Sequence, residues 1–452
     1  MTPHRKILLV AYAGQGHIIP ALRFANRLLK LGVHVTFSTS VSMVRRIEKE
    51  TIPHGLTLAP FSDGHDDGKQ ETTSLQQFQT DFATYGASAI AEIISSAATG
   101  GDPFDHLVYT TTIPWVARIA NAQGIKSTLL WCQSATILDI YYYYVNEYEG
   151  LISGIKNKET FPINLPGLPP LTTADLPSFI LPSHPKELDF IKKDLKGHIE
   201  ALKISPRILV NTFNELEVES IRAIDKLEFL PIGPLIPSEY FDEKNSSENS
   251  LGKDFFDRTE DDCIQWLNTK PKSSVVYVSF GTLANLSMKQ LEEVAIGLLE
   301  FRRPFLWVIR DSEQAGRLSK IEELNKQGMI VGWCSQVVVL RHQAIGCFVM
   351  HGGWNSTTEA LVAGVPTVVF PQWSDQCTNA KMMEDVWRTG VRVRRREEDG
   401  VVEGKEIERC VEMVMGDEDM KRNAIKWREL AREALSDKGT SNINLQVFLI
   451  NI

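Results

Sequence analysis

The chain lacks the features that mark membrane, nucleic-acid-binding and secreted proteins. No apolar run approaches the roughly eighteen residues that cross a membrane, and Ile7–Ala13 is too short for a signal peptide. The net charge of −9, with no basic block beyond Arg394–Arg396, argues against nucleic acid or an anionic membrane as the main partner. We therefore expect a soluble, cytoplasmic protein with no integral membrane segment.

Signals for a bound metal are also missing. The six cysteines contain no Cys-x-x-Cys pair and show no metal-ligand spacing with histidine, which predicts reduced thiols. No Asp-x-Asp stands in a loop suited to a divalent cation, and the adjacent pairs Asp66–Asp67 and Asp261–Asp262 are expected at the surface. The sequence predicts neither a metal nor a resident cofactor.

The first half of the chain alternates strand and helix patterns. Lys6–Ala13 is a buried-strand pattern, Ile18–Leu31 has one apolar helical face, and Val33–Thr39 is the next strand. This βαβ order predicts a parallel sheet with helices on its faces. The turn at Gly14–Gly16 has two glycines but not the third of the dinucleotide fingerprint, so a dinucleotide site is weakly supported.

A change in composition divides the chain. The segment Ile232–Ser238 and the polar run Asp242–Asp254 predict a linker, with 452 residues and 43% apolar content enough for two cores. Ser274–Phe280 opens the second part as a strand. Ser287 with Gln290 predicts a capping box for the helix that follows.

The stretch from Trp333 to Gln376 combines elements of a nucleotide site. Gly346–Met350 is a strand pattern, two glycines follow His351, and Asn355 or Ser356 is expected to cap a helix that ends at Gly364. A strand, a glycine turn and a helix N-terminus form an anion site, because free N–H groups and the helix dipole favour negative charge.

The neighbouring side chains suit the rest of a sugar nucleotide. Glu359 lies one helical turn after Asn355 and can accept hydrogen bonds from ribose hydroxyls, while Trp333 offers a flat face for a base. Asp375 and Gln376 supply two acceptors and an amide donor for sugar hydroxyls.

This segment closely resembles the signature box of plant UDP-dependent glycosyltransferases, which are inverting, metal-independent enzymes of family 1. The likeness extends from Gly14-Gln15-Gly16-His17 to the final helix, with one departure at Gly352, where the family usually has cysteine. The motifs are nearest to the branch with anthocyanin 5-O-, crocetin and indole-3-acetate glucosyltransferases. The resemblance implies an α/β GT-B fold with two Rossmann-like, doubly wound domains facing a cleft. Its parts would be an acceptor domain at 1–235, a linker at 236–255, a UDP-sugar domain at 256–430 and a helical segment at 431–452 that packs back on the first domain.

The resemblance also implies the donor residues, with Gln376 favouring UDP-glucose over UDP-galactose. The implied UDP-sugar contacts are Thr282, Trp333, Cys334, Gln336, His351, Gly353, Trp354, Asn355, Ser356, Glu359, Trp373, Asp375 and Gln376.

His17 follows a strand at the edge where open α/β sheets bind ligands, a position at which a lone histidine is more often a structural, N-cap-like group than a base. The resemblance of Gly14–Pro20 to the family implies that His17 is instead the general base. The family usually supports this histidine with an aspartate, and Thr110 stands at that position. A threonine can hold the imidazole but cannot stabilise imidazolium by charge. This matters more for a phenol than for a carboxylic acid that is already ionised. We therefore hypothesise that the acceptors include carboxylates.

Aromatic and apolar residues of the first half are expected to line the acceptor pocket. The candidates are Tyr12, Phe82, Trp115, Trp131, Gln133, Tyr142 and Phe179.

The function predicted in this way is inverting transfer of glucose from UDP-glucose to a small lipophilic, phenolic or carboxylic plant metabolite such as a flavonoid. The product would be a β-glucoside or a β-glucose ester. UDP-glucose would be a co-substrate, and a monomer is the default expectation. Two alternatives share the fold and donor site: a sugar-nucleotide epimerase and a non-catalytic UDP-sugar-binding protein.

Overall fold

The computed structural model describes residues 5–47, 52–154, 161–183, 189–237, 261–282 and 286–452, which fall into two compact units. Unit 1 comprises Met1–Pro237 and Ala434–Ile452, and unit 2 comprises Ser238–Glu433. Most of the linker predicted at 236–255, including the polar run 242–254, lies outside the described residues.

Unit 1 is built on a parallel sheet with the strand order β3-β2-β1-β4-β5-β8-β9. Its strands are β1 (Lys6–Val10), β2 (His34–Ser38), β3 (Thr57–Leu58), β4 (His106–Thr110), β5 (Ser127–Trp131), β8 (Arg207–Val210) and β9 (Glu228–Pro231). On β1, Ile7 pairs with Val35 of β2 on one side and with His106 of β4 on the other. The strand order reverses between β1 and β4. At such a point the loops after the two strands part, and open α/β sheets bind ligands there.

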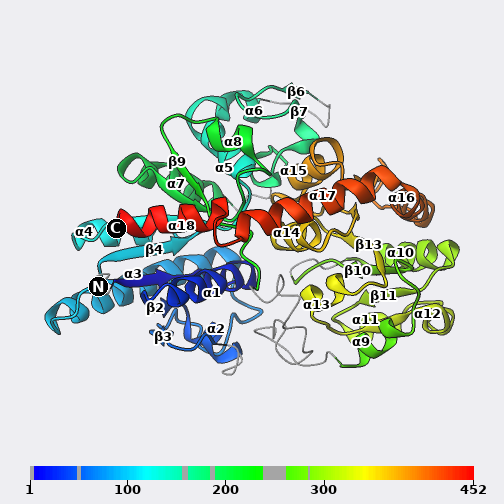
Figure 1. The fold of residues 1–452 in the computed structure, drawn as a ribbon, viewed down its shortest axis with the longest axis horizontal. Helices are drawn as coiled ribbons and strands as arrows, with labels where there is room; N and C mark the ends of the chain where they lie inside the picture. The colour runs from blue at the N-terminus through cyan, green and yellow to red at the C-terminus, as the bar shows by residue number, and fades with distance from the viewer. Residues whose placement is uncertain (1–4, 48–51, 155–160, 184–188, 238–260, 283–285) are drawn as a thin grey trace. The chain divides into compact units, whose positions relative to one another are not determined.

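Helices surround this sheet, and several begin at residues whose side chains cap them. The helices are α1 (Gln15–Lys30), α2 (Val41–Arg46), α3 (Leu75–Thr99), α4 (Trp115–Ala122), α5 (Ala135–Tyr143), α6 (Glu149–Ser153), α7 (Asp189–Ile204), α8 (Val218–Arg222) and α18 (Thr440–Ile450). A π-helical turn (Tyr144–Tyr148), two 3₁₀ turns (Thr173–Asp175 and Ser178–Ile180) and the hairpin strands β6 (Pro162–Ile163) and β7 (Leu171–Thr172) complete the unit. Ser74 and Ser134 each accept a backbone N–H three residues on, which fixes the starts of α3 and α5. The chain's last helix, α18, packs beside β9 (Figure 1).

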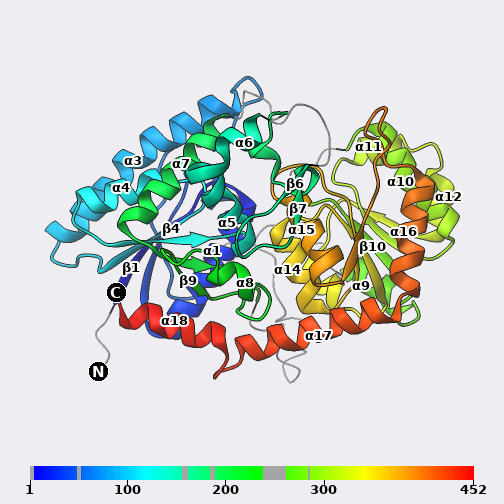
Figure 2. The same ribbon diagram turned by 90° about the horizontal axis from the view of Figure 1, so that it is seen from above.

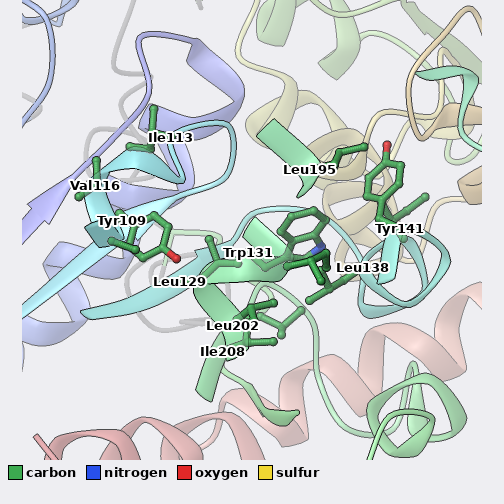
Figure 3. Close-up of a cluster of buried hydrophobic side chains, with 14 of the residues drawn as sticks. Tyr109, Ile113, Val116, Leu129, Trp131, Leu138, Tyr141, Leu195, Leu202 and Ile208 are labelled. Atoms are coloured by element: carbon green, nitrogen blue, oxygen red, sulfur yellow. The ribbon is translucent and has the colours of Figure 1, made fainter. Parts of the chain in front are cut away.

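The core of unit 1 explains why its strands are almost continuously apolar. Both β4 and β5 are buried along their whole length, as expected for parallel strands covered on both faces. Figure 3 shows part of this core, where Trp131 of β5 lies among Leu138 of α5 and Leu195 and Leu202 of α7.

Unit 2 repeats the doubly wound plan, with the parallel order β12-β11-β10-β13-β14-β15. Its strands are β10 (Val275–Ser279), β11 (Phe305–Val308), β12 (Met329–Val331), β13 (Ile345–Met350), β14 (Thr367–Val369) and β15 (Gly390–Arg392). Its helices are α9 (Asp261–Asn268), α10 (Met288–Phe301), α11 (Ser312–Gly316), α12 (Ile321–Gln327), α13 (Gln336–Arg341), α14 (Trp354–Ala363), α15 (Gln376–Lys381), α16 (Gly404–Gly416) and α17 (Glu418–Leu435). A π-helical turn at Met382–Val386 follows α15. The strand order reverses between β10 and β13, and α16 packs along α10 (Figure 2).

One helix start differs from the sequence expectation. Ser287 does cap α10 by accepting the Gln290 N–H, but the Gln290 side chain does not return to complete a capping box. It instead exchanges two hydrogen bonds with the backbone of Val402, at 2.8 and 2.9 Å. Gln290 therefore joins α10 to the segment before α16.

In the described part of the chain, no helix is both long and apolar enough to cross a membrane.

Candidate active site

His351 lies at the switch point of unit 2, where the loops after β10 and β13 come together around its ring. A Cβ added to Gly281, after β10, would lie 2.6 Å from His351 Cε1. A Cβ added to Gly353, after β13, would lie 2.4 Å from His351 Nε2. Real Cβ atoms do not approach other atoms so closely, so both loops need glycine at the ring. Gly281 also has a positive φ of 75°, which glycine adopts readily.

The start of α14 is simpler than predicted. Gly353 is the N-cap residue and no side chain caps the helix, so the expectation that Asn355 or Ser356 would cap it was wrong. A glycine cap brings no side-chain acceptor to the N–H groups of the first helical turn. These N–H groups can therefore donate hydrogen bonds to an anionic ligand. The other end is as predicted, because Gly364 terminates the helix in the left-handed conformation with φ 70°.

A hydrogen-bonded network joins α13 to α14. Gln336 Nε2 donates to Ser356 Oγ at 2.9 Å and to Glu359 Oε2 at 2.8 Å. Ser356 and Glu359 are both buried, and Trp333 lies half-buried two residues before Ser335, the N-cap of α13. This arrangement fixes the Glu359 carboxylate and leaves it further acceptor capacity, because a carboxylate can take about four hydrogen bonds.

Gln376 is held by its own loop. Its Oε1 atom accepts the backbone N–H groups of Gln372 at 2.7 Å and Trp373 at 3.1 Å. These two hydrogen bonds orient the side-chain amide, so that its Nε2 group can donate a hydrogen bond to a sugar hydroxyl.

Asp375 and the glycine turn are linked through Asn379. The Nδ2 atom of Asn379 donates to Asp375 Oδ2 and to the carbonyl oxygen of Gly352, both at 2.9 Å. Gly352 has φ +85°, and a Cβ there would lie 2.8 Å from Val369 Cγ1. Glycine suits this position better than the cysteine usual in the family, and the backbone contributes through its carbonyl.

The remaining donor candidates occupy different surroundings. Trp354 is only 4% exposed and packs on Trp387, with ring centroids 6.1 Å apart, whereas Trp373 is half-buried. Cys334 is buried, with Sγ 3.6 Å from the Tyr277 hydroxyl. Trp373 is therefore better exposed for contact with a ligand than Trp354 or Cys334.

The electrostatics of this region involve a cation that sequence reasoning missed. Arg310, two residues after β11, donates a hydrogen bond to the carbonyl oxygen of Thr282. Thr282 is exposed. Burial, assisted by the charge of Arg310, lowers the pKa of His351 to about 4. His351 is therefore neutral at pH 7 in the free protein, and Arg310 is the nearby positive charge.

His17 lies at the switch point of unit 1, in the first turn of α1. Its ring packs edge-on against Tyr12, with centroids 5.2 Å apart. Burial lowers the pKa of His17 to about 4, so the imidazole is neutral at pH 7 and can accept a proton. Its Nδ1 atom is buried and has no hydrogen-bond partner among the described residues. The Thr110 hydroxyl, which we expected to hold the ring, instead accepts the Tyr12 N–H at 3.0 Å.

Three of the acceptor candidates form an aromatic cluster with His17. Tyr12 packs on Phe82 at 5.2 Å between centroids, and Phe82 on Trp115 at 6.3 Å. Trp131 belongs to the core, where it is fully buried and donates through Nε1 to the Ser134 carbonyl. The other three candidates are half-buried and lie on separate segments, namely Gln133, Tyr142 and Phe179.

Sequence reasoning missed two residues of this site, Arg310 and Asn379, whose contacts are with residues from other elements or turns. The weak signal available was position, since Arg310 follows a strand at the ligand-binding edge and Asn379 lies one helical turn after Asp375.

The described residues hold no group of three or more His, Cys, Asp and Glu side chains placed to bind a metal ion. Two doubly wound units, one with a strand–glycine–helix anion site next to an oriented carboxylate, define a nucleotide-binding protein of the GT-B type.

Comparison with known proteins identifies the family. The family described as "UDP-glucoronosyl and UDP-glucosyl transferase" matches residues 200–451. The chain is 49% identical to UDP-glycosyltransferase 75C1 of Solanum lycopersicum, covering 100% of this chain and 98% of that protein. It is 48% identical to the chloroplastic crocetin glucosyltransferase of Gardenia jasminoides, over 99% and 98% of the two chains. The crystal structure of Os79 from O. sativa with UDP superposes with a TM-score of 0.87 at 32% identity, over 98% and 99% of the chains.

The chain belongs to this family of UDP-glycosyltransferases. The predicted family, its plant branch and the GT-B fold class are confirmed, and a UDP-sugar is the co-substrate.

Proposed function

We propose that this enzyme transfers glucose from UDP-glucose to a hydroxyl or carboxyl oxygen of a small plant metabolite, with inversion at the anomeric carbon. The pair of switch points carries the proposal, since each sheet reverses its order at the loops that hold one of the two histidines, His17 in unit 1 and His351 in unit 2. The crocetin glucosyltransferase and the UDP-bound relative support a glucose donor and a small acceptor.

The donor is held by unit 2. Trp333, Gln336 and Glu359 take the uridine, and the N-terminus of α14 with His351 and Arg310 takes the diphosphate. The contacts that orient Glu359 and the α14 turn support these roles. Asp375 and Gln376 bind the glucose hydroxyls. The fixed carbonyl of Gln376 and the carboxylate of Asp375, which accepts a hydrogen bond from Asn379, support this role.

The reaction is a single displacement. The acceptor oxygen forms a bond to the anomeric carbon while the bond from that carbon to the diphosphate oxygen breaks, and UDP leaves with the electron pair. A hydroxyl acceptor gives its proton to the neutral His17 ring, whereas a carboxylate has none to give. Helix N–H groups, His351 and Arg310 stabilise the charge that develops on the diphosphate.

A panel of phenols and carboxylic acids incubated with UDP-glucose or UDP-galactose tests the proposal. Mass spectrometry is expected to show the mass of one added hexose, and proton NMR of the product is expected to show the β-anomer. UDP-glucose is expected to outperform UDP-galactose. UDP release without any added acceptor, conversion of the donor to its epimer, or an α-linked product would each overturn the proposal.

The cytosolic location and the monomeric state predicted from the sequence remain predictions. A fluorescent fusion in plant cells tests the first, and sedimentation velocity tests the second.

A further inference from the structure

A half-buried carboxyl group that the mechanism does not use lies in unit 1 beside the loop after β4. Asp194, on α7, accepts a hydrogen bond at Oδ2 from Gln79 Nε2 at 3.0 Å. The same Gln79 nitrogen, on α3, donates to the carbonyl oxygen of Thr112 at 3.2 Å. Gln79 is only 6% exposed, so this junction between two helices and a loop is well defined.

The loop after β4 is also hydrogen-bonded to a second residue of α7. The backbone N–H of Thr112 donates to His198 Nε2 at 3.0 Å, and His198 lies one helical turn after Asp194. The His198 ring is stacked on Tyr109 of β4, with an interplanar angle of 2°. Thr112 has a φ of 78°, an unfavourable conformation for threonine, and the two hydrogen bonds hold it there. Asp194 is therefore anchored next to the end of β4, the strand that carries Thr110.

Tyr12 connects this carboxyl group to the proposed base. Its ring touches His17, and its phenol group lies in the field of two carboxyl groups, Asp194 and Asp63. Burial raises the pKa of Tyr12, and the negative charges of Asp194 and Asp63 raise it further. Asp194 thus acts electrostatically on the aromatic side chain that packs against His17.

Burial raises the pKa of Asp194 to about 7. The hydrogen bond from Gln79 and the positive charges of Lys193, on the same helix, and Arg118, on α4, lower this pKa but do not cancel the effect of burial. The ionised form is therefore well populated near neutral pH and increases as the pH rises.

We propose that Asp194 is a specificity-determining residue that selects acceptors by charge, favouring neutral hydroxyl acceptors over carboxylates. The inference rests on the proposed function, because it assumes that the acceptor binds beside Tyr12 and His17. A carboxylate bound there must approach a like charge in a poorly solvated region, which costs free energy that a neutral phenol does not lose.

The charge of Asp194 and the threonine at position 110 have opposite consequences for acceptor choice. Thr110 carries no charge and alone would favour carboxylates, whereas the Asp194 carboxylate disfavours an ionised acceptor.

Two acceptors with the same ring system, 2-naphthol and 2-naphthoic acid, provide the test. By analogy with phenolic and carboxylic side chains, the first stays neutral and the second stays ionised between pH 6 and 8. The variant Asp194→Asn keeps the acceptor oxygen for Gln79 but removes the charge. We expect the ratio of kcat/KM for naphthoic acid to that for naphthol to rise at least about tenfold, which is about 1.4 kcal/mol of lost discrimination.

A matched control removes one negative charge from the same helix. Glu200 is exposed and forms an ion pair with Lys203. Glu200→Gln is expected to leave the ratio of kcat/KM for naphthoic acid to that for naphthol unchanged. In the wild-type enzyme the ratio is expected to fall as the pH rises from 6 to 8, and in Asp194→Asn it is expected to stay flat.

The outcomes separate this inference from the proposed function. An unchanged ratio in Asp194→Asn, an equal loss for both acceptors, or an equal shift in Glu200→Gln would overturn the role of Asp194 while glucosylation itself stands. If the wild-type enzyme glucosylates no acceptor at all, the proposed function fails first. Thermal unfolding of each variant reports whether the fold is kept.

Discussion

Replacing Gly353 with alanine perturbs the donor site at one defined contact. Gly353 has φ −66° and ψ 147°, values that alanine adopts without strain, so the backbone imposes no penalty of its own. The added Cβ would lie 2.4 Å from His351 Nε2, and ordinary van der Waals contact begins at about 3.4 Å. The imidazole ring must therefore move by about 1 Å, the difference between these two distances.

A displacement of that size is expected to be costly. Misplacing a catalytic group by 1 Å reduces the rate by roughly 10²-fold, which corresponds to about 2.7 kcal/mol in the activation free energy. We expect Gly353→Ala to lose that factor in kcat/KM for UDP-glucose, measured by coupled UDP release. UDP affinity, measured by isothermal titration calorimetry, is expected to fall as well.

Gly416→Ala is the matched control, because a Cβ at Gly416 meets nothing within 4 Å and the residue ends α16 in the same unit. This control is expected to retain wild-type kinetics and at least wild-type stability. Full activity in Gly353→Ala, or an equal loss in Gly416→Ala, would show that His351 does not act from the position described.

Three further predictions follow from single side chains. Thr110→Asp keeps an acceptor for the N–H of Tyr12, whose ring packs on His17, and adds a negative charge at that position. We expect kcat/KM for a phenol to rise about tenfold relative to that for a carboxylate, and an unchanged ratio would remove the argument from Thr110. Burial lowers the pKa of His17, His106 and His351 to about 4 and that of His198 to about 3, so the stability that these neutral rings confer is present above about pH 6.5 and is lost as the pH falls through these values. In urea titrations, His106→Asn is expected to reduce the dependence of the free energy of unfolding on pH below pH 6 by about 1.4 kcal/mol per pH unit. Gln376→Ala leaves the N–H groups of Gln372 and Trp373 without their acceptor and removes the proposed contact to the sugar. We expect kcat/KM for UDP-glucose to fall at least about tenfold while Kd for UDP stays within twofold, and a parallel loss of both would contradict the assignment to the sugar.

The sequence predicted the features that depend on local pattern. Continuous apolar runs marked the parallel strands, since a strand covered on both faces has no polar side to alternate with. The end of α14 at Gly364 followed from glycine's access to the left-handed conformation. The nucleotide segment was recognisable because its motifs lie within one short stretch of chain.

The features that were missed depend on contacts between distant residues. Gln290 satisfied the local rule for a capping box, yet its amide group pairs with Val402, which lies 112 positions away. Gln79 and Asp194, which are 115 positions apart, meet only because α3 and α7 converge on one loop. No periodicity or spacing in the sequence carries that information.

The central claim is that His17 accepts the acceptor's proton while unit 2 holds the donor. Steady-state glucosylation of 2-naphthol by His17→Gln, with UDP binding measured on the same sample, tests this claim most directly. The account predicts a fall in kcat of about 10²–10⁴-fold with Kd for UDP within twofold of the wild-type value. A variant that turns over 2-naphthol at the wild-type rate would contradict it.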